Sequence, residues 1–303
     1  MKARIGIIGT GWVGTSVAFS TLLAGHAREL WLHDQRADVA EGEAMDLADG
    51  AAFYPRCAVR AVALEQMREA DVVVLAAGRN GRPDESRLDL LRDNARIAAG
   101  IGRTLAGSNA IVLVVTNPVD VLTRVVTEAS GLPPERVIGT GTLLDTARLR
   151  ERLAGRLGLS TQSIHAQVLG EHGDSSVMQW SGARVGGVAL RDWPGWQAGE
   201  EATLAAQVRR AAYEVIQRKG ATNHAIGLVT AELIGCLVRD EHRVLPVSRV
   251  QDGACGLRGV ALSLPALVGA GGAVRVIEPA LDAAERDALA ASVAVLDAAH
   301  AAL

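Results

Sequence analysis

The stretch Arg4-Ile5-Gly6-Ile7-Ile8-Gly9-Thr10-Gly11-Trp12-Val13-Gly14 decides the predicted fold. Its apolar start is typical of a buried strand, its glycines have the spacing G-x-G-x-x-G, and residues 13–24 after them have a helical pattern. Asp34 follows twenty residues after Gly14, at the end of the next apolar run. The glycine spacing alone is a weak signal, because glycines also make ordinary turns. Strand, glycines, helix and acidic residue together predict a dinucleotide-binding site.

The parts of this pattern have separate chemical reasons. Three glycines without side chains let a pyrophosphate approach the amide groups at the N-terminus of the helix. The Asp34 carboxylate can accept hydrogen bonds from both ribose hydroxyls and would repel a 2′-phosphate, which favours NAD over NADP. Arg36 is close enough in the sequence to keep NADP as the alternative. The predicted cofactor-binding residues of this stretch are Gly9, Gly11, Val13, Gly14 and Asp34.

Short apolar runs alternate with amphipathic stretches through the first half of the chain. The runs lie at 4–8, 29–33, 59–63, 72–77, 110–116 and 136–139. Continuous branched residues, as in 72–75, are typical of strands buried on both faces of a parallel sheet that helices cover. We therefore expect an α/β fold built on a doubly wound parallel sheet.

The pattern changes after about Gly141. Long helical stretches follow at 142–157, 200–219 and 222–240, with less regular strands between them, and an alanine-rich helix is expected over 281–303. A length of 303 residues fits two domains at about 150 residues each. We predict a dinucleotide-binding domain over 1–141 and a second, α+β domain over 142–303.

Composition excludes several classes of function. The chain is 49% hydrophobic with a net charge of −3, which argues against disorder and against a nucleic-acid or anionic-membrane partner. The longest apolar runs span six residues, far short of a membrane helix, and the N-terminus lacks a secretory pattern, so we expect a cytoplasmic protein. The three cysteines have no Cys-x-x-Cys spacing, and no metal site is expected.

A second group of chemical residues begins the second domain. Asp145 and Arg148, three residues apart in a predicted helix, share one face, and His172 follows in a strand-to-loop passage among small and acidic residues. Taken singly, these residues are better explained as a surface ion pair and an ordinary loop histidine. Beside a nicotinamide site, an aspartate, a histidine and arginines predict hydride transfer to a 2-oxo acid.

With these motifs in place, the chain resembles the L-lactate and malate dehydrogenase family essentially from end to end. The motifs that carry the resemblance are residues 9–14, Ala77-Gly78, Glu85-Ser86-Arg87, Thr116-Asn117-Pro118-Val119-Asp120, Asp145-Thr146-Ala147-Arg148 and Gly170-Glu171-His172-Gly173-Asp174. The resemblance implies a Rossmann domain followed by a C-terminal α+β catalytic domain. It adds Gly78 and Asn117 to the expected cofactor-binding residues.

The resemblance also implies a role for each site residue. His172 would be the general acid in carbonyl reduction and the base in reverse, and Asp145 would hold its tautomer. Arg148 would bind the substrate carboxylate through two charge-assisted hydrogen bonds. Arg87 would polarise the substrate carbonyl from a lid formed by residues 79–86. Asn117 would bond to nicotinamide and substrate.

The identity of the substrate depends on the lid. Six residues before the lid arginine, the family has Gln for pyruvate or Arg for oxaloacetate, whereas this chain has Gly81. Arg82, one residue out of register, keeps malate dehydrogenase activity as the alternative. Residues 139–142, 173–175 and 220–223, with Thr222 at the pocket wall, favour L-lactate dehydrogenase activity on pyruvate, a glycolytic reaction. A missing side chain at the pocket mouth also predicts tolerance of bulkier 2-oxo acids.

Two residues suggest regulation. Arg150 projects about 200° around the helix from Arg148 and so cannot share the substrate pocket. In similar bacterial L-lactate dehydrogenases, an Arg here and a His at the position of His165 bind fructose 1,6-bisphosphate at a subunit interface. The resemblance thus implies an allosteric effector site and a homotetramer or dimer. The alternative is a solvated arginine and a structural histidine.

A different class of protein, a non-catalytic NAD-binding regulator, stays open as the rival. The combination of Asp145, Arg148, His172 and Arg87 argues against it, because a protein that only binds NAD needs neither an acid–base pair nor two substrate-binding arginines. A nicotinamide-dependent glycosidase would need a metal site, for which the sequence offers no cluster of ligands.

Overall fold

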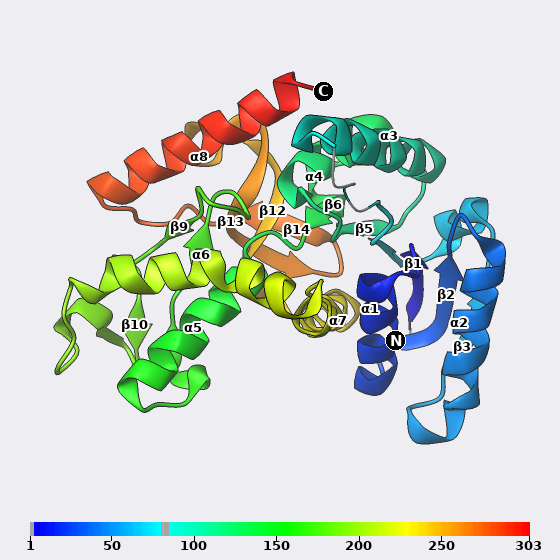
Figure 1. Ribbon diagram of the computed structural model, residues 1–303, viewed down its shortest axis with the longest axis horizontal. Coiled ribbons are helices and arrows are strands. Elements are labelled where there is room, and N and C mark those ends of the chain that lie inside the picture. Colours follow the sequence, from blue (N-terminus) through cyan, green and yellow to red (C-terminus); the bar gives the residue numbers. More distant parts are fainter. Residues whose placement is uncertain (1–2, 80, 82–84) are drawn as a thin grey trace.

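A nine-stranded sheet forms the centre of the molecule in the computed structural model, which describes residues 3–79, 81 and 85–303 (Figure 1). Its first six strands are β1 (Ala3–Ile8), β2 (Ala27–His33), β3 (Ala58–Ala61), β4 (Val72–Leu75), β5 (Ile111–Val114) and β6 (Val137–Gly139). They pair in parallel in the order β6-β5-β4-β1-β2-β3. The predicted α/β fold with a doubly wound parallel sheet is confirmed. The order reverses between β1 and β4, which is where such sheets bind ligands.

Helices cover both faces of this sheet, as the apolar strand runs require. They are α1 (Trp12–Ala24), α2 (Ala37–Asp49), α3 (Arg87–Leu105) and α4 (Val119–Ser130). One core packs α1 residues such as Val17 and Leu22 against the sheet, together with Ile234 from the second half of the chain. The other packs Ala98 of α3 and Val126 of α4 against the opposite face. Helix α1 starts at Trp12, directly after Gly11, so its N-terminus faces the point where the strand order reverses.

The second half of the chain contributes four helices, and three of its strands belong to the main sheet. They are α5 (Leu143–Leu157), α6 (Glu200–Lys219), α7 (His224–Val238), α8 (Ala283–Ala301), β12 (Arg243–Asp252), β13 (Arg258–Gly269) and β14 (Gly272–Val276). The last three strands are antiparallel and extend the main sheet, because Ser248 of β12 pairs with Gly139 of β6. The sequence pattern suggested less regular strands here. Helices α4, α7 and α8 pack on β13, so its two faces are both covered and its pattern lacks alternation.

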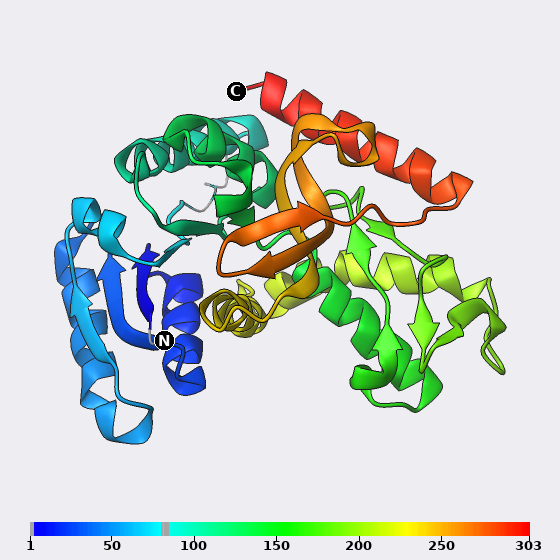
Figure 2. The same ribbon diagram turned by 180° about the vertical axis from the view of Figure 1, so that it is seen from behind.

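Two small sheets complete the second half, and both lie beside α5 and α6 in the views of Figures 1 and 2. One has the order β11-β10-β7 and the other pairs β8 with β9. Their strands are β7 (Ile164–His165), β8 (Val168–Leu169), β9 (Val177–Met178), β10 (Arg184–Val185) and β11 (Val188–Ala189). Their core joins α5, α6 and three tryptophans. Within the described ranges, no helix is long and apolar enough to cross a membrane.

Candidate active site

His172 lies in the loop that follows β8, and the main sheet fixes that loop. Gly170 forms an isolated antiparallel bridge with Ser263 of β13, and its φ of 79° is a conformation that favours glycine. A Cβ at Gly170 would stand 2.7 Å from Ser292 Oγ of α8. The loop therefore leaves the sheet at a position where only glycine fits, and His172 is carried toward α5.

Asp145 connects His172 to Arg148. His172 Nδ1 lies 2.5 Å from Asp145 Oδ2, and Arg148 Nη1 donates to Asp145 Oδ1 at 3.0 Å. Asp145 is only 6% exposed, in the first turn of α5, and both its oxygens are used by these two partners. An ionised carboxylate accepts but does not donate, so Nδ1 carries a proton and Nε2 is left for a ligand.

The charges of this group shift each other's pKa values. Burial favours the neutral form of Asp145, but the hydrogen bond and charge of His172 and the charge of Arg148 more than offset it, and its pKa lies below the usual value. Burial disfavours protonated His172, yet Asp145 outweighs burial, and the pKa of His172 is raised above its usual 6.5. The pair is therefore arranged as a carboxylate beside an imidazole that gains a proton readily.

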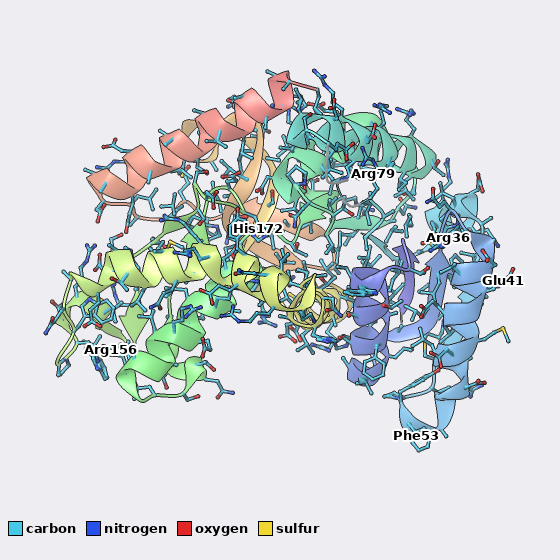
Figure 3. The ribbon with its side chains drawn as sticks, viewed as in Figure 1. Arg36, Glu41, Phe53, Arg79, Arg156 and His172 are labelled. Atoms are coloured by element: carbon cyan, nitrogen blue, oxygen red, sulfur yellow. The ribbon has the colours of Figure 1, made fainter. Side chains whose placement is uncertain are left out.

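A cavity of about 130 Å³ opens beside this pair. The residues that line it are Val13, Val115, Asn117, Thr140, Gly141, Leu144, Arg148, His172, Ala212, Ile216, Thr222 and Ile226. The structure thus brings together four residues predicted for the substrate site: Asn117 from the loop after β5, Arg148 of α5, His172 from the loop after β8, and Thr222 from the loop before α7. Figure 3 shows His172 between the two halves of the molecule.

Helix α6 supplies a wall of this site that sequence reasoning missed. Ala212 and Ile216 line the cavity, and Arg209 and Tyr213 line a neighbouring one of about 260 Å³ that also contains His172. Ile216 is 45% exposed although it is apolar. An exposed apolar residue four positions after Ala212 in a long helix was the available signal, but helical periodicity does not say which face meets a ligand.

A second cleft, of about 490 Å³, lies at the ends of β1, β2 and β4 and contains four of the predicted cofactor-binding residues, whereas Val13 and Asn117 line the cavity beside His172. Gly9, Gly11, Asp34 and Gly78 line it. Asp34 Oδ2 accepts the Thr10 N–H at 3.0 Å, and Oδ1 accepts the Arg36 N–H at 3.1 Å. Although burial opposes ionisation, these hydrogen bonds hold the pKa of Asp34 below its usual value. The acidic residue is thus an ordered anion at the edge of the cleft.

The glycines fit the approach of a dinucleotide. A Cβ at Gly14 would stand 1.9 Å from Gly9 O, so Gly14 is required for packing of α1 on β1. At Gly11, by contrast, a Cβ would meet no protein atom within 4 Å. Gly9 has a φ of 94°, which favours glycine. The open space at Gly11, before the N-terminus of α1, suits a pyrophosphate.

The lid residues are only partly described. Gly81 is exposed, and a Cβ there would lie 3.2 Å from Leu90 Cδ2. Arg82 lies outside the described residues, and the side chain of Arg87, the first residue of α3, does too. Arg79, the first residue of the lid, donates from Nη1 to Glu85 at 2.7 Å and from Nε to Asp93 at 2.8 Å.

The two predicted effector residues lie away from His172. Arg150 Nε donates to the Ala166 carbonyl at 2.9 Å, next to His165, which is exposed on β7. Arg150 lines a cavity of about 580 Å³ that also includes Arg243. Burial and the charge of Arg243 lower the pKa of Arg150, so the cavity contains closely placed positive charges.

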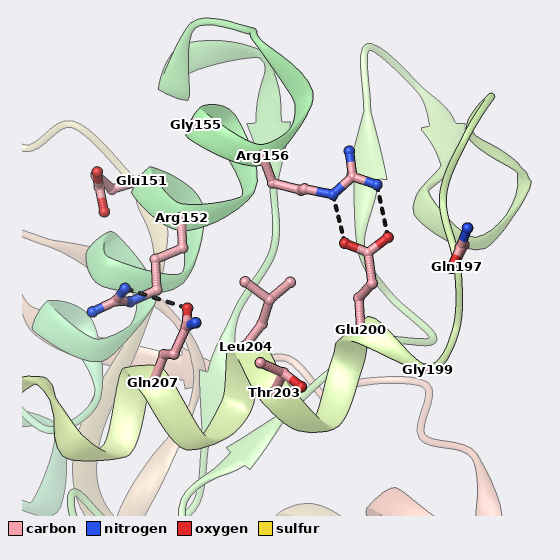
Figure 4. A pocket seen from close by; sticks show the side chains of 10 residues that line it. All are labelled: Glu151, Arg152, Gly155, Arg156, Gln197, Gly199, Glu200, Thr203, Leu204 and Gln207. Carbon is pink, nitrogen blue, oxygen red and sulfur yellow. Dashed lines mark hydrogen bonds and ion pairs between the residues drawn. The ribbon is translucent and has the colours of Figure 1, made fainter.

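The surface also carries an open groove between α5 and α6, shown in Figure 4. Arg156 of α5 and Glu200 of α6 form an ion pair across it, with Arg156 Nη2 2.8 Å from Glu200 Oε1. Arg152 also donates to Gln207 across the groove. None of the residues predicted from the sequence lies in this groove. In the described part of the chain, no group of three or more His, Cys, Asp or Glu side chains could hold a metal.

Comparison with known proteins agrees with this geometry. Residues 3–139 match the family described as lactate/malate dehydrogenase, NAD binding domain, and residues 142–302 match lactate/malate dehydrogenase, alpha/beta C-terminal domain. An L-lactate dehydrogenase of Salinibacter ruber is 44% identical over 295 residues, covering 95% of this chain and 93% of the relative. One of Thermus aquaticus is 42% identical over 307 residues, covering 99% of each. A ligand-bound minor L-lactate dehydrogenase of Enterococcus mundtii superimposes with a TM-score of 0.96 at 37% identity, covering 100% of this chain and 98% of that one.

Proposed function

We propose, from the premise that this chain belongs to the lactate/malate dehydrogenase family, that it catalyses the reversible NADH-dependent reduction of pyruvate to L-lactate. The contact that carries the proposal is the 2.5 Å approach of His172 Nδ1 to Asp145, with Arg148 on the same carboxylate. The chain is an NAD-dependent oxidoreductase. Its relatives are named L-lactate dehydrogenases, and the malate alternative is not favoured.

In the mechanism, bound NADH supplies the hydride that reduces the substrate carbonyl carbon. His172 donates the proton on Nε2 to the carbonyl oxygen, and in the reverse direction it takes the hydroxyl proton of L-lactate. Asp145 accepts the hydrogen bond from Nδ1 throughout, so the imidazole keeps its orientation and its positive form is stabilised. Loss of such an acid–base group costs about 10²- to 10⁴-fold in rate.

The substrate is oriented by the groups around His172. Arg148, with one nitrogen on Asp145, presents its remaining donors to the cavity, where a carboxylate can bind them in pairs. Apolar Leu144 and Ile216 line the same cavity and keep water away from the reacting atoms. We assign Asn117 to nicotinamide and substrate and Arg87 to the carbonyl oxygen.

We also propose that the enzyme accepts 2-oxo acids bulkier than pyruvate, because of Gly81. It leaves the lid without a side chain at the position that selects substrates in the family, and each extra buried methylene returns about 0.8 kcal/mol. The test compares kcat/KM for pyruvate, 2-oxobutanoate, phenylpyruvate and oxaloacetate. We expect pyruvate and 2-oxobutanoate to lie within about 100-fold of each other. A larger preference for pyruvate contradicts the wide pocket, and a dominant rate with oxaloacetate supports the malate alternative through Arg82.

The effector proposal rests on Arg150 and His165. The cavity contains Arg150 and Arg243, and Glu232 lines it and pairs with Arg243. The remaining excess of positive charge, with exposed His165 nearby in the fold, suits a sugar bisphosphate that bridges two subunits. Titration of fructose 1,6-bisphosphate at low pyruvate should lower the half-saturation concentration of pyruvate. Arg150→Ala should remove the effect and keep the basal rate. An unchanged half-saturation concentration in the unsubstituted protein refutes the effector site.

We also propose a homotetramer or dimer that works in the cytoplasm. Large apolar side chains are exposed on the helices of the first half, among them Trp12 at 63% and Met45 at 69%, which suits burial against a second copy. Light scattering of the purified protein measures its mass directly. A monomeric mass at the concentration of the activity assay contradicts the oligomer.

A further inference from the structure

A second carboxylate, Asp120, contacts the backbone of His172. Asp120 lies in the first turn of α4, only 2% exposed, and its Oδ2 accepts the His172 backbone N–H at 2.7 Å. Asp145 contacts the ring of the same histidine. One carboxylate therefore fixes where the His172 backbone sits, and the other fixes how its ring is turned.

The other oxygen of Asp120 is buried near the Ser248 hydroxyl. Asp120 Oδ1 is buried without a hydrogen-bond partner among the described residues, and so is the Ser248 hydroxyl of β12. Burial raises the pKa of Asp120 to about 6, although Ser248 and His172 act in the opposite direction. Asp120 is the acidic residue in the first turn of α4, where a carboxylate is favourable, but burying a carboxyl group this completely is costly. This cost points to a function in the adjacent His172 loop.

The charged groups around Asp120 are few. Glu171 and His172 face it from the loop after β8, while β12 contributes only the uncharged Ser248. On the α5 side, Asp145 and Arg148 act on His172 with opposite signs. The charge of Asp120 is one of the influences that favour protonated His172, and it acts from the backbone side.

We propose that Asp120 is a positioning residue for His172, which holds the backbone of the catalytic loop and, when ionised, favours the protonated imidazole. The inference rests on the proposed function, because it assigns to Asp120 the support of the acid–base group of that reaction. Arg148 and the cofactor cleft do not depend on it. Its loss should therefore affect the proton-transfer step more than the binding of pyruvate or NADH.

Two substitutions separate the charge of Asp120 from its hydrogen bond. Asp120→Asn keeps the shape and an oxygen that can accept the His172 N–H but removes the charge, so the fall in pyruvate reduction with rising pH should begin at a lower pH. Asp120→Ala removes both, and kcat should fall by about 10- to 100-fold with a smaller change in KM for pyruvate. Asp297→Asn is the control. Asp297 is an exposed residue of α8 that pairs with Arg124 of α4, the helix that also carries Asp120.

The control should reproduce the unsubstituted pH profile. A pH profile of Asp120→Asn that superimposes on the unsubstituted one, together with an unchanged kcat in Asp120→Ala, overturns the inference. If the unsubstituted protein consumes no NADH with any 2-oxo acid, the proposed function itself fails, which is a different result.

A spectroscopic measurement avoids any substitution at Asp120. In the His172→Gln variant, no imidazole titrates at this position, so the backbone amide resonance of residue 172 reports the state of the Asp120 carboxylate. We expect the amide proton to shift upfield as the pH falls from about 8 to about 5 and the carboxylate loses its charge. An amide resonance that stays constant over this range shows that Asp120 does not titrate against this N–H and overturns the inference.

Discussion

At the scale of residues, the Asp145 carboxylate is shared by two side chains. Asp145 accepts from both Arg148 and His172, so the group that binds the substrate carboxylate and the group that moves the proton are held in one frame. Either contact alone would be common on a protein surface. A buried carboxylate with both partners is a way to keep two catalytic distances constant.

Arg148 should not tolerate replacement by lysine. Lysine keeps the charge, but it cannot bind a carboxylate through a planar pair of donors while it also donates to Asp145, so KM for pyruvate should rise by about 10-fold or more. Steady-state kinetics with saturating NADH measure it. Arg156→Lys is the matched control on the same helix, because Arg156 binds Glu200 at the outer groove (Figure 4). Equal KM values for the two variants would exclude the carboxylate-binding role.

The pH dependence follows from the raised pKa of His172. Pyruvate reduction needs the protonated imidazole, so its kcat/KM should fall as the pH rises through that pKa, above 6.5, while kcat/KM for lactate oxidation should rise over the same interval. Asp145→Asn removes the main cause of the raised pKa, and both transitions should move to lower pH. Transitions that stay in place after this substitution would mean that another group titrates.

At the scale of elements, the turn from β1 into α1 separates folding from ligand binding. Gly14→Ala should lower the thermal unfolding midpoint and weaken NADH binding, because its Cβ would meet Gly9 O at 1.9 Å. Gly11→Ala should keep the midpoint within a few degrees and still weaken NADH binding by about 10-fold, since its Cβ would point into open space before the helix N-terminus. Fluorescence titration with NADH and thermal melts measure the two effects. Full NADH affinity in Gly11→Ala would place the pyrophosphate elsewhere.

The elements of the first half were predictable because each carries a local signal. Apolar runs gave the six parallel strands, although 72–77 was expected as strand where β4 ends at Leu75. The long antiparallel strands β12 and β13 were less clear. Their partners lie far away in sequence. Polar residues inside them, such as Ser248 and Ser263, pair with distant segments and interrupt any alternation of apolar and polar residues. Local patterns do not contain that information.

The candidate site was predictable to the extent that chemistry marks it in sequence. Asp145, Arg148 and His172 stand out by type and spacing, whereas Asn117 was expected from the family resemblance, and all four residues line one cavity. The wall from α6 and the contact of Asp120 with the His172 N–H were not predictable. Each depends on which segments meet across the molecule, and residues of these types occur at many positions. Asp120 was part of a quoted motif, but nothing in that motif pointed to its partner.

At the scale of the whole molecule, the sheet joins the two predicted domains. The boundary expected near Gly141 falls between β6 and α5, yet β12 from the second half pairs with β6 through Ser248 and Gly139. The cofactor cleft and the His172 loop are thereby attached to one sheet. The division at residue 141 stays a prediction about the sequence, whereas the sheet connects its two sides.

This connection should make unfolding cooperative. Gly139→Ala places a Cβ 2.4 Å from Thr123 Oγ1 and 3.0 Å from Ser248 Cβ, so we expect a loss of about 1–3 kcal/mol and a lower midpoint for a single transition. Differential scanning calorimetry measures it. Gly42→Ala, in α2 with no atom within 4 Å of the new Cβ, is the control and should leave stability equal or slightly higher. Two separate transitions, of which only one responds to Gly139→Ala, would contradict a single cooperative unit.

The most direct measurement is the turnover of His172→Gln with pyruvate and NADH, combined with the affinity of that variant for NADH. We expect kcat to fall by about 10²- to 10⁴-fold while the Kd for NADH changes little, because the His172 imidazole donates the proton and does not hold the cofactor. An undiminished kcat would contradict it, since the proton would then reach the carbonyl oxygen from another group.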